Sequence, residues 1–226
     1  MKKVIFFGLI VLSVLGCSRS EIKNSNDNNN VIQETPELDS FSVFVSKFRV
    51  VDLPFKLCKG DDNWIDFYDD NDSIRIDKEE IIKFLYNNDS LEYINLDCYQ
   101  YYYGFNFTVS KDLTALIFYR VCENEYVGYE LGLFNSKGKK IESYFFSGSN
   151  GKDDTRVQIE SEININLEIT TTIISIESDN TNDTFLALKE IKKSLITNTG
   201  KIPLISKSDG VVGNYKFNEK YRIVKD

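Results

Sequence analysis

The sequence predicts an α+β protein that is mainly β, an antiparallel β-meander of about eight strands, curled or closed into a partial barrel, behind two short N-terminal helices. Three observations predict this class. Apolar residues recur at helical spacing in two short segments before residue 90. From Tyr99 onward, apolar and polar residues alternate as they do in strands with one buried face. Short polar turns separate these segments, which favours antiparallel pairing of consecutive strands.

The first helix is predicted to begin after Asp39, because an aspartate side chain suits the N-cap position. Apolar residues then follow at positions i, i+3, i+4 and i+7, which is the spacing of one helical face. These residues are Phe41, Phe44, Val45 and Phe48.

The second helix is predicted over residues 77–86. Asp77 stands at its N-cap and Glu80 at its third helical position, which is the capping-box arrangement. The apolar face that follows consists of Ile81, Ile82, Leu85 and Tyr86. An amphipathic segment of this kind is expected to lie on the sheet.

The first long strand is predicted to carry one aromatic face, made by every second residue: Tyr99, Tyr101, Tyr103, Phe105 and Phe107. Such a row could stack on sugar rings or pack into the core, and the regular alternation favours the core. The strand turns at Ser110–Asp112 into residues 114–122, which are apolar on both faces. We therefore expect this second strand to be central in the sheet.

The later segments complete the meander. Further strands are predicted at residues 127–133, 140–147, 163–173 and 201–206, with a last hairpin or strand at 214–224. Residues 163–173 alternate without interruption and are interpreted as one long strand. Residues 185–197 fit either a strand or a helix.

The first seventeen residues have the three parts of a secretory signal. Lys2 and Lys3 are followed by an apolar run over residues 4–12, and the small residue Gly16 precedes Cys17. The apolar run is shorter than the roughly 20 residues that a transmembrane helix needs. An ordinary cleaved signal peptide and a buried N-terminal helix are the alternative interpretations.

Residues 14–17, Val-Leu-Gly-Cys, resemble the lipobox of bacterial lipoproteins. The resemblance implies cleavage after Gly16, acylation of Cys17 with diacylglycerol and palmitate, and export to the cell envelope. Two or more acyl chains anchor a protein stably in a bilayer, and Ser18 after the cysteine favours the outer membrane. The chain is then divided into a signal peptide (1–16), the lipidated cysteine with a flexible polar tether (17–38), and one β-rich globular domain (39–226).

Composition excludes several classes of function. The 226 residues include no histidine, so neither a Ser-His-Asp nor a Cys-His catalytic group can form, and no zinc site can use imidazole. The formal net charge is −8. An acidic chain without a basic stripe repels phosphate backbones, and we therefore expect no nucleic-acid partner.

An acidic stretch, residues 69–80, resembles the twelve-residue calcium loop of EF-hand proteins. The oxygen ligands of Ca²⁺ would be Asp69, Asn71, Ser73, Asp77 and Glu80. Ile74 departs from the pattern, because it stands where the EF-hand loop has a glycine. The alternative is a polar turn that leads into the second helix, with Asp77 and Glu80 engaged in the capping box.

Three cysteines remain if Cys17 carries lipid, so one of them has no partner within the chain. Cys98 and Cys122 flank the first predicted hairpin and are the predicted disulfide pair. Pairing of Val109 with Thr114 would place Tyr101 opposite Cys122, so the disulfide requires a small register slip or a bulge. Cys58 is the alternative partner for either cysteine.

These patterns predict a lipid-anchored envelope protein with a non-enzymatic binding or scaffolding role, whose partner is an envelope protein or a glycan. The absence of histidine and of a nucleophile motif favours this class. One alternative is a glycan-directed hydrolase that uses two carboxylates from residues 61–72. Another is an inhibitor or an immunity-type lipoprotein.

Overall fold

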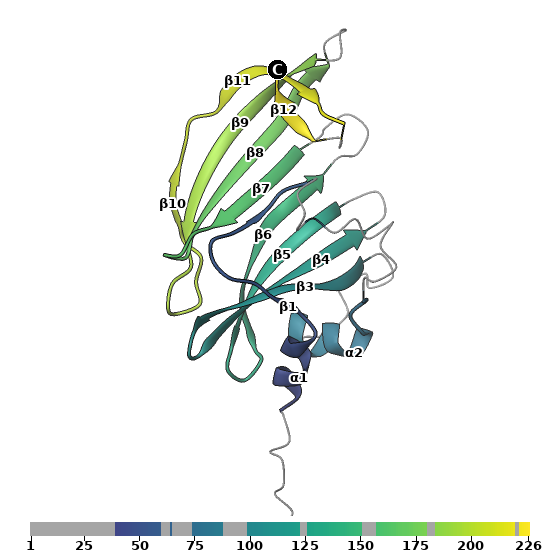
Figure 1. Ribbon diagram of the computed structural model, residues 1–226, viewed down its shortest axis with the longest axis vertical. Coiled ribbons are helices and arrows are strands. Elements are labelled where there is room, and N and C mark those ends of the chain that lie inside the picture. The colour runs from purple at the N-terminus through teal and green to yellow at the C-terminus, as the bar shows by residue number, and fades with distance from the viewer. Residues whose placement is uncertain are drawn as a thin grey trace, which may run out of the picture. The chain divides into compact units, whose positions relative to one another are not determined.

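One mixed β-sheet dominates the computed structural model, which describes residues 39–59, 64, 74–87, 99–122, 126–150, 157–179, 184–219 and 222–226 (Figure 1). The helical segments are α1 (Ser40–Ser46), α2 (Lys78–Glu80) and the π-helix η1 (Ile81–Leu85). The strands are β1 (Arg49–Val50), β2 (Phe55–Leu57), β3 (Tyr99–Ser110), β4 (Leu113–Cys122), β5 (Tyr126–Asn135), β6 (Lys140–Asn150), β7 (Val157–Ile163), β8 (Glu168–Asp179), β9 (Thr184–Leu195), β10 (Leu204–Lys207), β11 (Val211–Phe217) and β12 (Ile223–Lys225). The predicted class, mainly β with two short N-terminal helices, is confirmed.

The sheet is a meander from β3 to β9, in which each strand pairs antiparallel with the next one in the chain. β11 and β12 extend it beyond β9, and β10 also pairs with β9. At the other end, β1 pairs in parallel with β3, which makes the sheet mixed. The sheet does not close into a barrel. Its twelve strands exceed the predicted number.

The predicted strand over residues 163–173 is wrong, because a hairpin interrupts it. β7 ends at Ile163, and the side chain of Asn164 accepts hydrogen bonds from the backbone N–H groups of Asn166 and Glu168. Ile163 then lies directly opposite Ile169 of β8. Residues opposite each other share a face of the sheet, so the alternating pattern continues through the turn and hides it. The ambiguous segment 185–197 forms β9.

α1 begins as predicted. Asp39 has an extended conformation, and its side chain accepts hydrogen bonds from the N–H groups of Phe41 (2.9 Å) and Ser42 (3.0 Å). These bonds satisfy two of the donors that a helix start leaves free. They also lower the pKa of the Asp39 carboxyl, and the hydrogen bond from the backbone of Ser42 has the largest effect.

The predicted capping box of the second helix is wrong. Asp77 occupies the N-cap position, but its side chain makes no capping hydrogen bond. The side chain of Glu80 accepts hydrogen bonds from Lys47 and Tyr103 instead, and so connects this helix to α1 and β3. A charge-assisted hydrogen bond between elements replaces the weaker local bond to the backbone.

A bulge in β3 divides the aromatic row between the two faces of the sheet. Tyr103 pairs with Phe118 of β4, whereas Phe105 pairs with Ile117, so Gly104 is the extra residue. Phe118 and Ile117 point to opposite faces because they are neighbours in one strand. The prediction of a single aromatic face is therefore wrong, although Tyr101, Tyr103, Phe105 and Phe107 are all buried.

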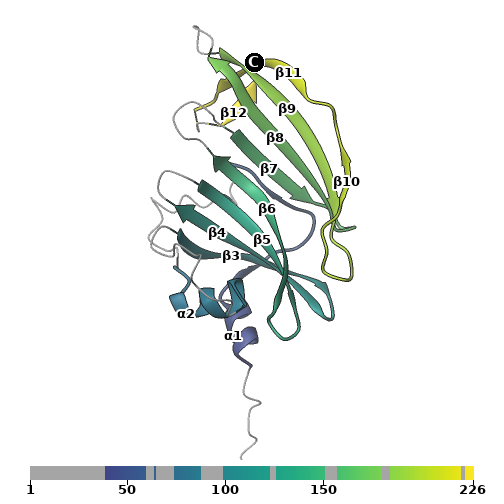
Figure 2. The same ribbon diagram turned by 180° about the vertical axis from the view of Figure 1, so that it is seen from behind.

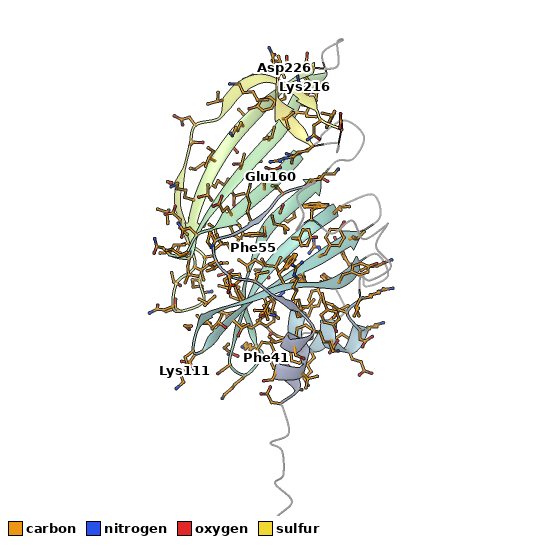
Figure 3. The ribbon with its side chains drawn as sticks, in the orientation of Figure 1. Phe41, Phe55, Lys111, Glu160, Lys216 and Asp226 are labelled. Atoms are coloured by element: carbon orange, nitrogen blue, oxygen red, sulfur yellow. The ribbon has the colours of Figure 1, made fainter. Side chains whose placement is uncertain are left out.

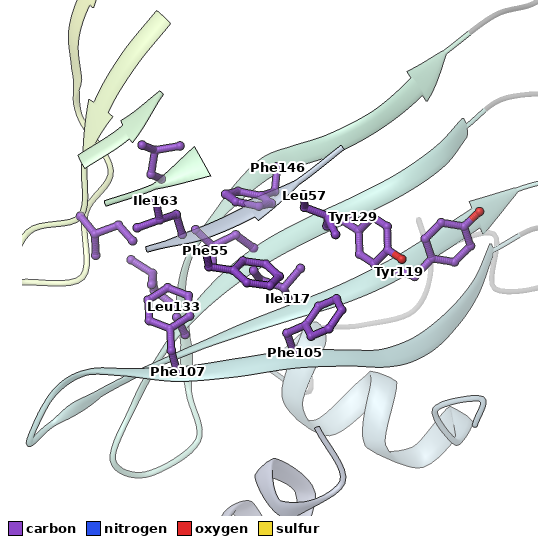
Figure 4. Close-up of a cluster of buried hydrophobic side chains, with 14 of the residues drawn as sticks. Phe55, Leu57, Phe105, Phe107, Ile117, Tyr119, Tyr129, Leu133, Phe146 and Ile163 are labelled. Atoms are coloured by element: carbon purple, nitrogen blue, oxygen red, sulfur yellow. The ribbon is translucent and has the colours of Figure 1, made fainter. Parts of the chain in front are cut away.

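The two faces of the sheet carry separate hydrophobic clusters. One lies under α1 and η1 and consists mainly of aromatic residues, including Phe41, Phe44, Phe84, Tyr101, Tyr103 and Phe134. Figure 2 shows these helices beside β3 and β4. The other lies on the opposite face and includes Phe55 and Leu57 of β2, which point toward Phe105, Tyr129 and Phe146 (Figure 4).

β2 fills a split in the sheet between β6 and β7. β6 pairs with only the first three residues of β7, and β2 pairs with the last three. The buried hydroxyl of Ser147 lies 2.9 Å from the carbonyl oxygens of both Leu57 and Ile159, and thus joins the three strands. The hydroxyl of Tyr144 in β6 hydrogen-bonds Thr171 in β8 at 2.8 Å, which shows that the sheet is curled here.

A third cluster lies where β11 and β12 end the sheet, and includes Phe185, Tyr215 and Ile223. Arg222 makes a bidentate ion pair with Glu160 of β7, at 2.6 and 2.7 Å (Figure 3 labels Glu160). The amide side chain of Gln158 bonds both the N–H and the carbonyl oxygen of Ile223. These contacts fasten β12 to β7, although the two strands are not neighbours in the sheet.

Candidate functional site

Most of the residues predicted to carry function lie outside the described residues. This applies to Gly16 and Cys17, to the acidic residues of segment 61–72, and to the calcium candidates Asp69, Asn71 and Ser73. Of the calcium candidates, Asp77 and Glu80 are described, and Glu80 is bonded to Lys47 at 2.6 Å. Within the described ranges no three acidic or cysteine side chains gather as a metal site would require. Calcium binding therefore stays a prediction.

Cys122, at the end of β4, is disulfide-bonded. Two bulges shift the β3–β4 register so that Tyr99, rather than Tyr101, lies opposite Cys122. The predicted partner, Cys98, directly precedes Tyr99 but lies outside the described residues, so the pairing itself stays a prediction. Cys58, the alternative partner, is a buried thiol.

A half-buried polar cluster lies beside η1, over β3 to β6. Glu130 of β5 lies 3.3 Å from the guanidinium of Arg120 and 3.9 Å from the ammonium of Lys140. The hydroxyls of Tyr86 and Tyr101 share a hydrogen bond next to these charges. The cluster joins the second helix to the sheet.

Burial shifts the pKa values of this region. It raises the pKa of the Tyr86 and Tyr101 hydroxyls, and it lowers the pKa of the Lys140 ammonium. Burial and the hydrogen bond to Glu80 raise the pKa of Tyr103 to about 12. The pKa of Lys47 is raised, mainly by its bond to Glu80. A folded state that keeps protons longer than the unfolded state loses stability as the pH rises.

We therefore predict that stability falls as the pH rises above about 10, where unfolded tyrosines begin to ionise. Lys140 opposes this fall, because its lowered pKa makes the folded state release a proton first. The three tyrosines and Lys47 outweigh it. Urea unfolding at increasing pH, with phenolate absorbance as a second signal, measures the effect. In Tyr101→Phe the fall should be shallower, and an identical pH dependence in that variant would contradict the prediction.

A cavity of about 550 Å³ opens next to the polar cluster. Its described lining consists of Arg75, Ile76, Asp77, Lys78, Ile81, Tyr99 and Gln100. The guanidinium of Arg120 stacks on the Tyr99 ring, 4.6 Å from its centroid. Asp77 is the one carboxylate among the described lining residues, so this lining lacks the carboxylate pair that glycoside hydrolysis needs. The cavity offers polar contacts and an aromatic wall.

The outer edge of the sheet beyond β9 carries several exposed apolar side chains close together in the chain. β10 and β11 lie along this edge (Figure 1), and four of their apolar side chains are more than half exposed: Leu204, Ile205, Val211 and Val212. We name residues 204–213 the β10–β11 edge. Within the described ranges no strand pairs with its outer side. An open edge presents unpaired backbone groups to any extended chain that approaches.

The β10–β11 edge itself holds one lysine, Lys207, and one aspartate, Asp209, and the strand behind it, β9, adds an excess of lysine. Residues 184–226 contain nine lysine and arginine residues but four acidic ones, in a chain whose net charge is −8. Lys189 lies opposite Val211, and Lys192 lies opposite Lys207. Neither Lys189 nor Lys192 has an ion pair with the described residues, whereas Lys207 is paired with Glu190 at 2.6 Å.

Sequence reasoning did not identify this edge. The hairpin or strand predicted at residues 214–224 leaves out Val211 and Val212, with which β11 begins, and an alternating pattern does not say whether a strand has one neighbour or two. The excess of lysine after residue 184 was a usable signal, since sheet edges are commonly marked by lysine.

Comparison of the chain with known protein families, curated proteins and solved structures finds no match. Among the described residues, no helix is long and apolar enough to cross a membrane.

Proposed function

We propose that the protein is a lipoprotein of the bacterial cell envelope, anchored through acylated Cys17 to the outer membrane, that binds a partner without catalysis. The observation that supports binding is the β10–β11 edge, which combines four exposed apolar side chains with backbone groups that no described strand pairs. A soluble protein rarely exposes such an edge without covering or breaking it. The lipobox-like residues 14–17 support the anchor.

The described residues begin at Asp39, and the sequence of residues 17–38 is rich in asparagine and serine. A polar segment of this composition cannot bury enough apolar surface to offset the entropy of ordering. In the proposed arrangement it holds the β-rich domain away from the bilayer and leaves the sheet edge accessible to partners.

Replacing Cys17 by alanine is predicted to abolish acylation and to move the protein from the membrane fraction to the soluble fraction. Intact mass and detergent partitioning measure both effects, and Ser20→Ala is the control that keeps the acylated residue. The wild type and the control should begin at Cys17 and carry acyl mass. A wild type without acyl mass that fractionates like Cys17→Ala would overturn the anchor.

Protease treatment of whole cells then locates the domain. Removal of the domain from intact cells directs the search for partners to extracellular proteins and glycans. Protection by intact cells directs it to the periplasmic envelope proteins.

A further inference from the structure

We propose that an extended segment of a partner protein, with both acidic and apolar residues on each of its two faces, adds as a new strand to the β10–β11 edge. The inference rests on the proposed binding function, and it names the mode of binding and the chemistry of the partner. Strand addition uses main-chain hydrogen bonds for affinity and alternate side chains for specificity. Three features support it: the direction of the edge's backbone groups, its exposed side chains, and the lysines of β9 behind it.

The backbone of β11 is oriented for strand addition. The N–H of Asp226 donates to the carbonyl oxygen of Asn214 at 3.1 Å, so the backbone groups of Asn214 point toward β12 and away from β9. Alternate residues of an antiparallel strand point their backbone groups to the same side. The N–H and C=O of Val212 therefore also point outward. The described part of β12 pairs with residues 215–217 of β11 and does not reach Val212. An added strand would continue the row of hydrogen bonds that β12 makes along the outer side of β11.

The edge offers apolar contacts on both faces. Val211 is 67% exposed and shares a face with Lys189, its partner in β9. Val212 is 59% exposed and shares the opposite face with Leu188. An added strand whose side chains alternate would bury one valine with each of its faces. Burial of the two valines would add a hydrophobic contribution to the binding free energy, beyond that of the main-chain hydrogen bonds.

Charge selects an acidic partner. Lys189 and Lys192 lie three residues apart in β9 and therefore point to opposite faces, one beside each side of the edge. Pairing of two copies of this edge would add a second set of these lysines behind the same interface, and an excess of like charge at an interface is unfavourable. Asp209 lies in the loop between β10 and β11, so the acidic residues of the partner belong beside the lysines and not opposite this loop.

A designed peptide tests the proposal on the full chain purified in detergent. The probe is a fluorescent ten-residue peptide in which pairs of valines alternate with pairs of glutamates, so that each face of the added strand carries both residue types. Its counterpart carries lysine in place of glutamate. Fluorescence anisotropy at low salt should show binding of the glutamate peptide and at least about tenfold weaker binding of the lysine peptide, because charge complementarity sets partner choice. Binding should weaken as salt is added.

Val212→Pro removes the outward N–H and leaves the ladder to β9 intact, since proline is tolerated at a strand edge. It should weaken binding at least about tenfold, because the lost hydrogen bond and the ring both block pairing. Val212→Ala keeps the N–H and should weaken binding only about threefold through lost contact area. Equal thermal unfolding midpoints of the two variants establish that both remain folded.

Lys189→Glu combined with Lys192→Glu should weaken binding of the glutamate peptide at least about tenfold and should improve binding of the lysine peptide. The matched control is Lys111→Glu, an exposed charge reversal in the β3–β4 turn, which Figure 3 labels. This control should leave both affinities unchanged. In a hydrogen-exchange experiment, the glutamate peptide should slow exchange at the N–H of Val212.

Four results would overturn the inference. They are absence of peptide binding, equal binding by Val212→Pro and the wild type, equal affinity for the two peptides, and a self-associated wild type that Val212→Pro converts to monomer without any peptide binding. The last result would assign the edge to a second copy of the chain. None of these results affects the acyl mass at Cys17, and Cys17→Ala should bind the peptide like the wild type. The proposal of a lipid anchor and the proposal of strand addition are therefore tested independently.

Discussion

Replacing Phe44 by alanine is expected to lower the free energy of unfolding by about 3–5 kcal/mol. Phe44 is fully buried between α1, η1 and the sheet. Its ring stacks on Phe84 with centroids 4.5 Å apart, and it meets the edges of Phe48 at 5.3 Å and Tyr103 at 5.9 Å. α1 has seven residues, which is too short for a helix to be stable alone. The loss of Phe44 therefore removes a central contact among those that hold both helical segments on the sheet.

Val43→Ala is the matched control on the same helix, because Val43 is 43% exposed. Its cost should stay below about 0.5 kcal/mol. Urea unfolding can be followed through Trp64, the single tryptophan, whose ring contacts Tyr129 on the other face of the sheet. Trp64 thus reports unfolding of the sheet and not of the helix alone. Equal costs for the two variants would show that α1 does not depend on this cluster.

The parts of the fold that depend on neighbours in the chain could be predicted from the sequence. The Asp39 cap, the turn at Ser110–Asp112 and the central position of β4 each follow from a few adjacent residues. Hairpin pairing also follows, because short turns leave adjacent strands little choice of partner. This local information is sufficient for the fold class.

Features that depend on partners far along the chain could not be predicted. Glu80 has a residue pattern that fits a capping box, but its actual partner, Lys47, is 33 residues away. The turn at Asn164 joins two strands whose facing residues continue the same alternation, so the pattern contains no break. The pairing of β2 with β7 spans about a hundred residues and has no local signal.

The same limit explains why the candidate site was missed. Val211 and Val212 have the pattern of an ordinary strand, and they become a candidate binding surface only because no described strand covers their outer side. The sites that local motifs did predict, around Cys17 and Asp69, fall outside the described residues and stay predictions. A motif can be recognised from adjacent residues, whereas an exposed edge is a property of the assembled sheet.

Replacing Gly104 by alanine is expected to cost about 3 kcal/mol, because the bulge in β3 leaves no room for a side chain. A Cβ at this position would overlap the backbone carbonyl oxygen of Ile117 in β4, well inside the 3.0 Å that real Cβ atoms keep. A backbone atom in a central strand cannot move aside as a flexible side chain can. The bulge must therefore open or shift its register.

A change of register at this bulge affects both faces of the sheet. Because the side chains of a strand alternate, a slip of one residue would turn Tyr101 and Tyr103 away from α1, or Phe105 and Phe107 away from β2. Urea unfolding measures the cost, and near-ultraviolet circular dichroism of the tyrosines measures the loss of packing. Gly213→Ala is the matched control, because its nearest neighbour would be the Tyr215 ring at an ordinary 3.4 Å.

The control should be neutral or stabilising by up to about 1 kcal/mol, since alanine restricts the unfolded chain more than glycine does. A cost for Gly104→Ala no greater than that of Gly213→Ala would mean that β3 accommodates a side chain at the bulge. In that case the division of the aromatic row would follow from the packing of α1 and β2 on the two faces. A large cost confined to Gly104→Ala would instead identify this one glycine as the residue that assigns the aromatic side chains to their faces.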